Sequence, residues 1–187
     1  MARRALIRVV LMAGVVASLS GAAAQNQHLQ HHSVTKGSSM QTPRSLAAEH
    51  RELHEVLARA TKEGGALGRA AAQLEKALAP HFKREEQIAT PPLGLLPKLA
   101  REDATADMRS VLPMTEALER ELPRMLQEHE VIRAAVTEFR AEAGKAGRAE
   151  YVRFSDDLAA HARQEEEILY PAAVLVGRYV KRTAPEK

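Results

Sequence analysis

The chain has 187 residues, with 27 Lys and Arg against 24 Asp and Glu, and no cysteine. The lack of cysteine excludes disulfides, thiolate metal sites, cysteine nucleophiles and thioether-attached haem, so any bound metal must be held by His, carboxylate or water. Only three Tyr, three Phe and no Trp occur, which indicates a core of small and aliphatic side chains, as helix-on-helix packing prefers, and predicts one all-α domain.

A secretory signal peptide is predicted for residues 1–24. Arg3, Arg4 and Arg8 supply positive charge, an apolar run follows, and small residues precede Gln25. A membrane anchor is the weaker alternative, because Arg8 leaves the apolar run shorter than the ~20 residues that a bilayer span needs. We therefore expect an exported, periplasmic protein without a stable membrane anchor after cleavage.

Cleavage would also remove the basic excess of the chain. Residues 1–24 hold three of the 27 basic residues and no acidic residue, which leaves 24 of each sign. No basic stripe with interleaved aromatic residues is present, so the sequence predicts no nucleic-acid partner. Residues 25–43, which contain many Gln, His and Ser, are predicted to be a flexible linker before a folded domain at 44–182.

The first two helices of this domain are delimited by glycine and proline. One begins near residues 43–45 and ends at the glycine pair 64–65, and the next runs from about residue 68 to residue 88. Prolines and a glycine between residues 91 and 97 then predict a loop that extends to about residue 103.

Two longer helices are predicted after this loop. The third covers about 105–143, with Pro113 and Pro123 as points where it could kink or split. The fourth covers about 148–169 and ends at the Tyr-Pro pair that follows, beyond which a short C-terminal helix is left open.

Apolar residues recur in each predicted helix at steps of three and four, the spacing of a buried bundle stripe. In chain order these seams are Leu46, His50, Leu53 and Leu57; Leu67, Ala71, Leu74, Leu78, His81, Glu85 and Ile88; Leu118, Leu122, Met125, His129, Ile132, Val136 and Phe139; and Tyr151, Phe154, Leu158, His161, Glu165 and Ile168. Every helix thus places a histidine where a core aliphatic residue is expected.

Two of these histidines are followed by a glutamate four residues later, at His81/Glu85 and His161/Glu165. Residues four apart on a helix differ by only about 40° in direction, so both members of each pair point to the same side. A buried carboxylate needs a compensating charge, and no Lys or Arg lies on the seams. The pattern therefore predicts a cation between the helices.

The pattern also repeats along the chain. The segment at 46–50 is similar to that at 125–129, and the segment at 81–86 is similar to that at 161–166. Two related half-sites suggest two metal ions, with Glu85 and Glu165 bridging them. The acids that follow, Glu86, Glu166 and Glu167, are expected to be exposed or to lie behind the ligands, since i+5 and i+6 rotate away from the histidine.

Over about residues 45–174 the sequence resembles the hemerythrin-like family of HHE cation-binding domains, whose halves carry a His on one helix and His-x-x-x-Glu on the next. The resemblance implies an up-down-up-down four-helix bundle with a di-iron centre, and family roles in oxygen or nitric oxide binding, sensing, iron storage or iron-sulfur repair. It implies ligand roles for His50, His81, Glu85, His129, His161 and Glu165.

His54 has two interpretations. Oxygen-carrying hemerythrins have a His-x-x-x-His pair on the third helix, whereas here Arg133 follows His129 and the first helix carries His50 and His54. If the two halves exchange roles, His54 is a fifth imidazole ligand. Otherwise it is a surface histidine beside the seam, because Arg51 and Glu55 indicate an exposed face there.

The donor set narrows the choice of metal and chemistry. Six or seven nitrogen and oxygen donors exceed the needs of one tetrahedral zinc ion, and mixed imidazole and carboxylate ligands suit iron or manganese, with iron favoured. An imidazole-rich site carries less negative charge than the four-glutamate di-iron bundles, which favours reversible ligand binding over oxygenase chemistry.

The sequence therefore predicts an exported di-iron protein that binds dioxygen, nitric oxide or a related small ligand as a carrier, a sensor or a stress-protection protein. An enzyme acting on ferrous iron, peroxide or nitric oxide is the alternative, and an iron-binding module without ligand chemistry is a third reading. The physiological ligand, the native metal pair and the oligomeric state are left open.

Overall fold

The computed structural model describes residues 41–186. The predicted signal peptide (1–24) and all but the last three residues of the predicted linker (25–43) lie outside the described residues. Within residues 41–186 every regular element is a helix and no strand is formed, which confirms the all-α prediction. In the same range we found no helix both long and apolar enough to cross a membrane.

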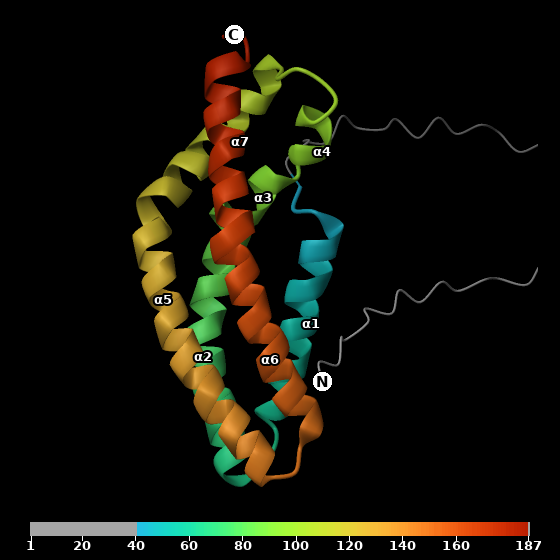
Figure 1. Ribbon diagram of the computed structural model, residues 1–187, viewed down its shortest axis with the longest axis vertical. Coiled ribbons are helices and arrows are strands. Elements are labelled where there is room, and N and C mark those ends of the chain that lie inside the picture. The colour runs from blue at the N-terminus through green and yellow to red at the C-terminus, as the bar shows by residue number, and fades with distance from the viewer. Residues whose placement is uncertain (1–40, 187) are drawn as a thin grey trace, which may run out of the picture. The chain divides into compact units, whose positions relative to one another are not determined.

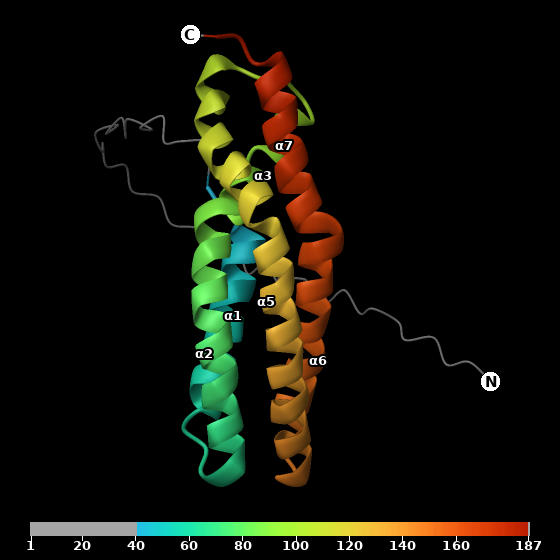
Figure 2. The ribbon, with the colours of Figure 1, turned by 90° about the vertical axis from the view of Figure 1, so that its left-hand side faces the viewer.

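Four long helices build the bundle, with shorter helical segments after the second and the fourth (Figures 1 and 2). In chain order they are α1 (Arg44–Ala60), α2 (Gly65–Ile88), α3 (Thr90–Leu93), α4 (Leu96–Leu99), the 3-10 helix η1 (Ala106–Val111), α5 (Leu112–Lys145), α6 (Ala149–Gln164), the π-helical turn η2 (Glu165–Leu169) and α7 (Tyr170–Thr183).

The long helices form two antiparallel pairs whose turns lie at the same end (Figure 2). Each turn contains a glycine with positive φ, Gly65 at 68° and Gly147 at 67°, a conformation that glycine adopts without steric cost. The two pairs pack so that α2 lies against α5 and α1 against α6. Seam residues of all four helices therefore face a common interior.

Apolar residues fill this interior on both sides of the histidine layer. The larger cluster, towards the two turns, includes Leu57, Leu74 and Phe139, and a second cluster, towards the start of α7, includes Met125 and Tyr170. Along every long helix the predicted metal ligands fall between members of these two clusters. Apolar packing thus fixes the backbone on either side of the polar layer.

The fourth helix departs from the prediction. It was expected to end at Tyr170–Pro171, but it continues through the π-helical turn η2 into α7, which has 14 residues. A π-turn takes up one more residue than an α-turn and shifts the following positions around the axis. Ile168, predicted on the seam, is consequently 59% exposed, while Tyr170 is buried in its place.

The range predicted as the third helix divides just before Pro113 into the 3-10 helix η1 and the long helix α5, which is unbroken from Leu112 to Lys145. Pro113 lies in the first turn of α5, where the backbone N–H would have no helical partner, and Pro123 lies inside the helix without splitting it. The segment predicted as a loop after α2 contains the short helices α3 and α4.

Candidate metal centre

Six of the seven predicted ligands come together in the middle of the bundle. Each is buried, with at most 3% of its surface exposed: His50, His81, Glu85, His129, His161 and Glu165. Their donor atoms form two groups in which all atoms lie within 4.8 Å of one another: His81, Glu85, His129 and Glu165 make the first, and His50, His161 and Glu165 make the second.

In the first group the imidazoles of α2 and α5 meet. The Nε2 atoms of His81 and His129 are 2.8 Å apart, close enough to share a proton or to converge on one cation. Oε1 of Glu85 lies 3.4 Å from Nε2 of His81, and Oε2 of Glu165 lies 3.4 Å from Nε2 of His129. This group therefore offers two imidazole nitrogens and two carboxylate oxygens.

In the second group the imidazoles of α1 and α6 meet. Oε1 of Glu165 lies 2.8 Å from Nε2 of His161 and 3.7 Å from Nε2 of His50. Oε2 of Glu85 lies 4.0 Å from Nε2 of His50. Each of the two glutamates thus turns one carboxylate oxygen to each pair of histidines.

Each group draws one imidazole from each of the two sequence repeats. His81 belongs to the first repeat and His129 to the second, and the same is true of His50 and His161. This arrangement follows from the packing of α2 against α5 and α1 against α6. The related half-sites of the sequence are therefore interleaved in the structure.

The Nδ1 atom of each of the four buried histidines faces a carboxylate outside the two groups. The contacts from Nδ1 are His81 to Glu128 at 3.0 Å, His129 to Glu166 at 2.6 Å, His161 to Glu49 at 3.1 Å and His50 to Glu86 at 3.6 Å. A carboxylate only accepts hydrogen bonds, so Nδ1 carries the proton in the three shorter contacts and Nε2 is directed at the centre. Outer carboxylates of this kind orient imidazole ligands and raise their basicity.

Two of these outer carboxylates, Glu49 and Glu128, were missed by reasoning from sequence. A signal was present, because the doublet Glu-His occurs at both 49–50 and 128–129, in the repeated segments. Glu166 fulfils the expectation of an acid behind the ligands. Glu86 is 53% exposed, yet lies beside His50.

The electrostatics of the buried layer favour a cation. Burial raises the pKa of Glu85, with the Glu165 charge adding to the effect and the hydrogen bond to His81 opposing it. Burial alone would also raise the pKa of Glu165, but the close imidazoles of His129, His161 and His50 hold it well below its usual range. The buried carboxylates therefore need positive charge beside them.

Three buried atoms of the two groups lack a well-directed hydrogen bond: Oε2 of Glu85, and Nε2 of His161 and Oε1 of Glu165, which lie 2.8 Å apart but are poorly aligned. An unpaired buried polar atom is costly, by about 1–3 kcal/mol. All three belong to the inner side of the polar layer, and all are ligand atoms that transition metals accept. The residues present therefore fit a bound metal.

A family model described as the hemerythrin HHE cation binding domain matches residues 42–173, which include both groups. The chain belongs to this family. The resemblance found in the sequence is thereby confirmed. Comparisons with curated proteins and with solved structures each found no match.

Two further side chains approach the centre of this hemerythrin-like bundle. The hydroxyl of Tyr170 donates a hydrogen bond to Oε1 of Glu85 and lies 3.4 Å from Nε2 of His81 and 3.3 Å from Nε2 of His129. The ring of Phe82 stacks on that of His50, with 4.7 Å between their centroids. Tyr170 thus lines the first group, and Phe82 lines the second.

His54 is not brought into either group. It is exposed, and its ring meets the edge of Phe82 with 5.0 Å between the centroids. Of the two interpretations offered by the sequence, this position corresponds to the histidine beside the seam.

Proposed function

We propose that this protein is an exported, non-haem di-iron protein that binds dioxygen, nitric oxide or a related small ligand in an up-down-up-down four-helix bundle. The two antiparallel helix pairs in Figure 2 support that topology. Metal binding follows from the family and from the buried His and Glu groups. The number and kind of ions, the ligand and the export are the proposed parts.

The observation that carries the two-ion proposal is the division of the carboxylate oxygens. Glu165 directs Oε2 at His129 and Oε1 at His161, and Glu85 directs Oε1 at His81 and Oε2 towards His50. A single ion would use only one side of each carboxylate. Two ions, one held by each histidine pair, would use both sides of Glu85 and Glu165, which would then be the shared ligands.

Iron is proposed because the donors are imidazoles and carboxylates and no thiolate is available. Four imidazoles and two carboxylates cannot fill the positions of two near-octahedral ions, which leaves room for a small exogenous ligand. Bound iron would supply reversible coordination of that ligand. The protein's own contribution is to exclude bulk water and to hold each Nε2 inward through its outer carboxylate.

The test is the metal content and visible spectrum of residues 25–187, purified anaerobically and then exposed to air. Two irons per chain and a charge-transfer band that reverses when dioxygen is removed are expected. Zinc as the bound metal, or no metal after reconstitution with iron, would contradict the proposal. Catalytic turnover of ferrous iron or peroxide, in place of stoichiometric and reversible uptake, would favour the enzyme alternative.

The ligand role of the carboxylates can be tested by replacing both Glu85 and Glu165 with Ala. The double variant is expected to lose the binding of two irons per chain, because both bridges are gone. Glu138→Ala is the control, since this exposed residue lies on α5 away from the centre. Retention of two irons by the double variant would refute the bridging role.

Export can be tested separately on the full chain. Cleavage after Ala24 is expected to give a mature protein that begins at Gln25, which mass spectrometry of the secreted or periplasmic fraction would detect. An intact N-terminus retained in the cytoplasm would contradict this part of the proposal.

A further inference from the structure

The two groups of metal ligands differ in how their outer carboxylates are held. Behind His81, Glu128 receives a hydrogen bond of 2.6 Å from Arg84, and behind His129, Glu166 receives one of 2.8 Å from Arg133. These carboxylates are therefore each held in place by an arginine as well as by a histidine.

Tyr170 closes the same group from the end of the bundle. Its side chain is 1% exposed, and its hydroxyl touches Glu85 and lies near both imidazoles. An ion held between His81 and His129 would thus lie beside the Tyr170 phenol. The two histidines would be backed by the Arg84–Glu128 and Arg133–Glu166 ion pairs.

The group at His50 and His161 is built more loosely. Its outer carboxylates, Glu49 and Glu86, are 42% and 53% exposed. Neither forms an ion pair with Lys or Arg within the described part of the chain. Each of them can therefore move towards water without breaking a contact to an arginine.

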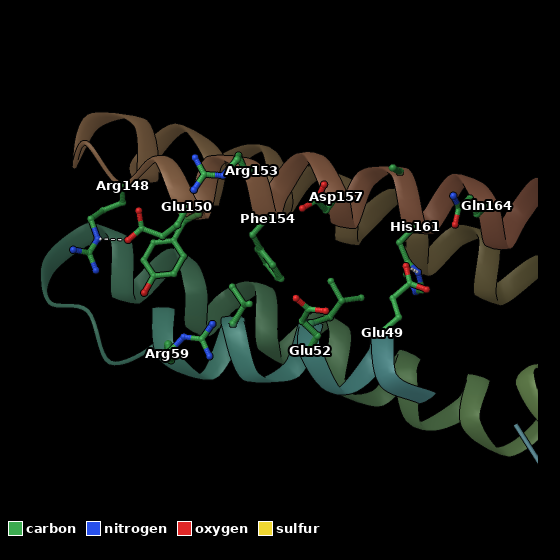
Figure 3. Close-up of a pocket in the computed structure, with 14 residues that line it drawn as sticks. Glu49, Glu52, Arg59, Arg148, Glu150, Arg153, Phe154, Asp157, His161 and Gln164 are labelled. Carbon is green, nitrogen blue, oxygen red and sulfur yellow. Dashed lines mark hydrogen bonds and ion pairs between the residues drawn. The ribbon is translucent and has the colours of Figure 1, made fainter. Parts of the chain in front are cut away.

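A groove of about 660 Å³ leads to this second group between α1 and α6. Figure 3 shows His161 at one end of the groove, beside Glu49, with Glu52 and Asp157 next along it. Arg59, Arg148 and Glu150 lie at the opposite end, and Arg153 lies between that end and Asp157. The acidic end of the groove is thus the end that reaches a buried histidine of the centre.

We propose that this groove is the route by which divalent iron enters and leaves the centre, and that the ion at His50 and His161 exchanges faster than the ion at His81 and His129. The inference rests on the proposed two-iron centre. Glu52 and Asp157 would raise the local concentration of the cation at the mouth. Glu49, which contacts His161, would be the last carboxylate on the path.

The entry route can be tested with the double variant Glu52→Gln and Asp157→Asn in the mature protein. The rate of Fe²⁺ uptake under anaerobic conditions at low ionic strength is expected to fall about tenfold, with the difference shrinking in high salt. The final content should stay at two irons per chain, since neither residue is a ligand. The control is Glu102→Gln with Glu138→Gln, which removes the same charge from exposed positions outside the groove.

The outcomes separate this inference from the proposed function. If the wild-type chain does not bind two irons, the proposed function itself fails. If the wild-type chain binds two irons but the groove variant and the control take up iron at equal rates, the groove is not the route.

The difference in exchange rate between the two ions can be tested by measuring the release of iron into an excess of a ferrous chelator. Two phases of one iron per chain each are expected, with rate constants at least about tenfold apart. Arg133→Gln should speed only the slow phase, because it frees Glu166 behind His129. Arg140→Gln is the matched control on the same helix, since Arg140 bonds to Asp156 on the surface. Release of both irons in one phase, or acceleration of the fast phase by Arg133→Gln, would overturn the assignment.

Discussion

The histidine layer and the apolar layer next to it are made by the same four helices but are stabilised in different ways. In the apolar layer Phe139 packs on Tyr151 and Phe154, with 5.8 and 6.0 Å between ring centroids. Burial of such side chains stabilises the fold whatever the metal content. About two to three helical turns from these rings, the four helices bury histidines and glutamates. The stability of that layer depends on which cations compensate the carboxylates.

The difference suggests that separate layers of the same helices stabilise the fold and bind the cation. The apolar layers fix the backbone. The polar layer can then keep a geometry that is favourable with a cation bound and less favourable in the metal-free protein. We therefore expect the metal-free protein to be folded and the metal to act mainly on the polar layer.

The largest expected effect is in the apolar layer. Phe139→Ala should lower the free energy of unfolding by about 3–5 kcal/mol, because it leaves a cavity among buried rings. The loss should be equal in metal-free and iron-loaded protein, as measured by urea denaturation. Val131→Ala on the same helix, at a position that is 60% exposed, should change stability by less than about 0.5 kcal/mol. A loss seen only in the metal-free form would show that the two layers are not independent.

The polar layer should respond to pH in the metal-free protein. Burial alone would lower the pKa of His161, but the Glu165 carboxylate, 2.8 Å from its Nε2, and the other nearby carboxylates raise the pKa to about 9. Because this value exceeds the unfolded value of about 6.5, the stabilisation is complete below pH 6.5 and is lost as the pH rises through 9.

We therefore expect the metal-free protein to lose stability between about pH 6.5 and 9, by at most roughly 3 kcal/mol. The iron-loaded protein should show little of this loss, because a bound ion compensates Glu165 in place of the proton. Urea denaturation of both forms across this range is the measurement. An equal loss in both forms would place its origin outside the polar layer.

A smaller effect is expected at Tyr170, where the polar layer meets the second apolar cluster. Tyr170→Phe removes the hydrogen bond to Glu85 and should destabilise the metal-free protein by about 1–2 kcal/mol. The effect should be smaller with iron bound, since the ion then satisfies the carboxylate. Tyr179→Phe, at a residue that is 37% exposed, is the control. Equal effects of Tyr170→Phe in both forms would mean that the hydroxyl contributes to packing alone.

The same contrast explains what the sequence could and could not predict. The positions of the buried histidines and glutamates were predictable because each lies on one helical seam, and periodicity within a helix is visible in the sequence. The outer pairs, such as His161 with Glu49 and His81 with Glu128, join different helices. Their partners depend on which helices pack together, and spacing along the chain does not contain that information.

The position of His54 illustrates a second limit. A step of four from His50 is compatible with either a buried or an exposed ring. Only the packing of α1 against α2 decides that the His54 ring is exposed and contacts the edge of Phe82. The turn η2 is a third case, because a seam count assumes 3.6 residues per turn and a π-turn breaks that count. Pro171, which cannot donate a backbone hydrogen bond, was the available hint.

The smallest expected effect tests that break in register. Ile168→Ala should change the free energy of unfolding by less than about 0.5 kcal/mol, because the residue is 59% exposed. Ile132→Ala, at a seam position that is 2% exposed, should cost about 2–5 kcal/mol. The two variants delete the same atoms, so the difference between them in urea denaturation reports burial directly. Equal costs would mean that the helix keeps its α-helical register through residues 165–169, and that Ile168 takes the seam position now held by Tyr170.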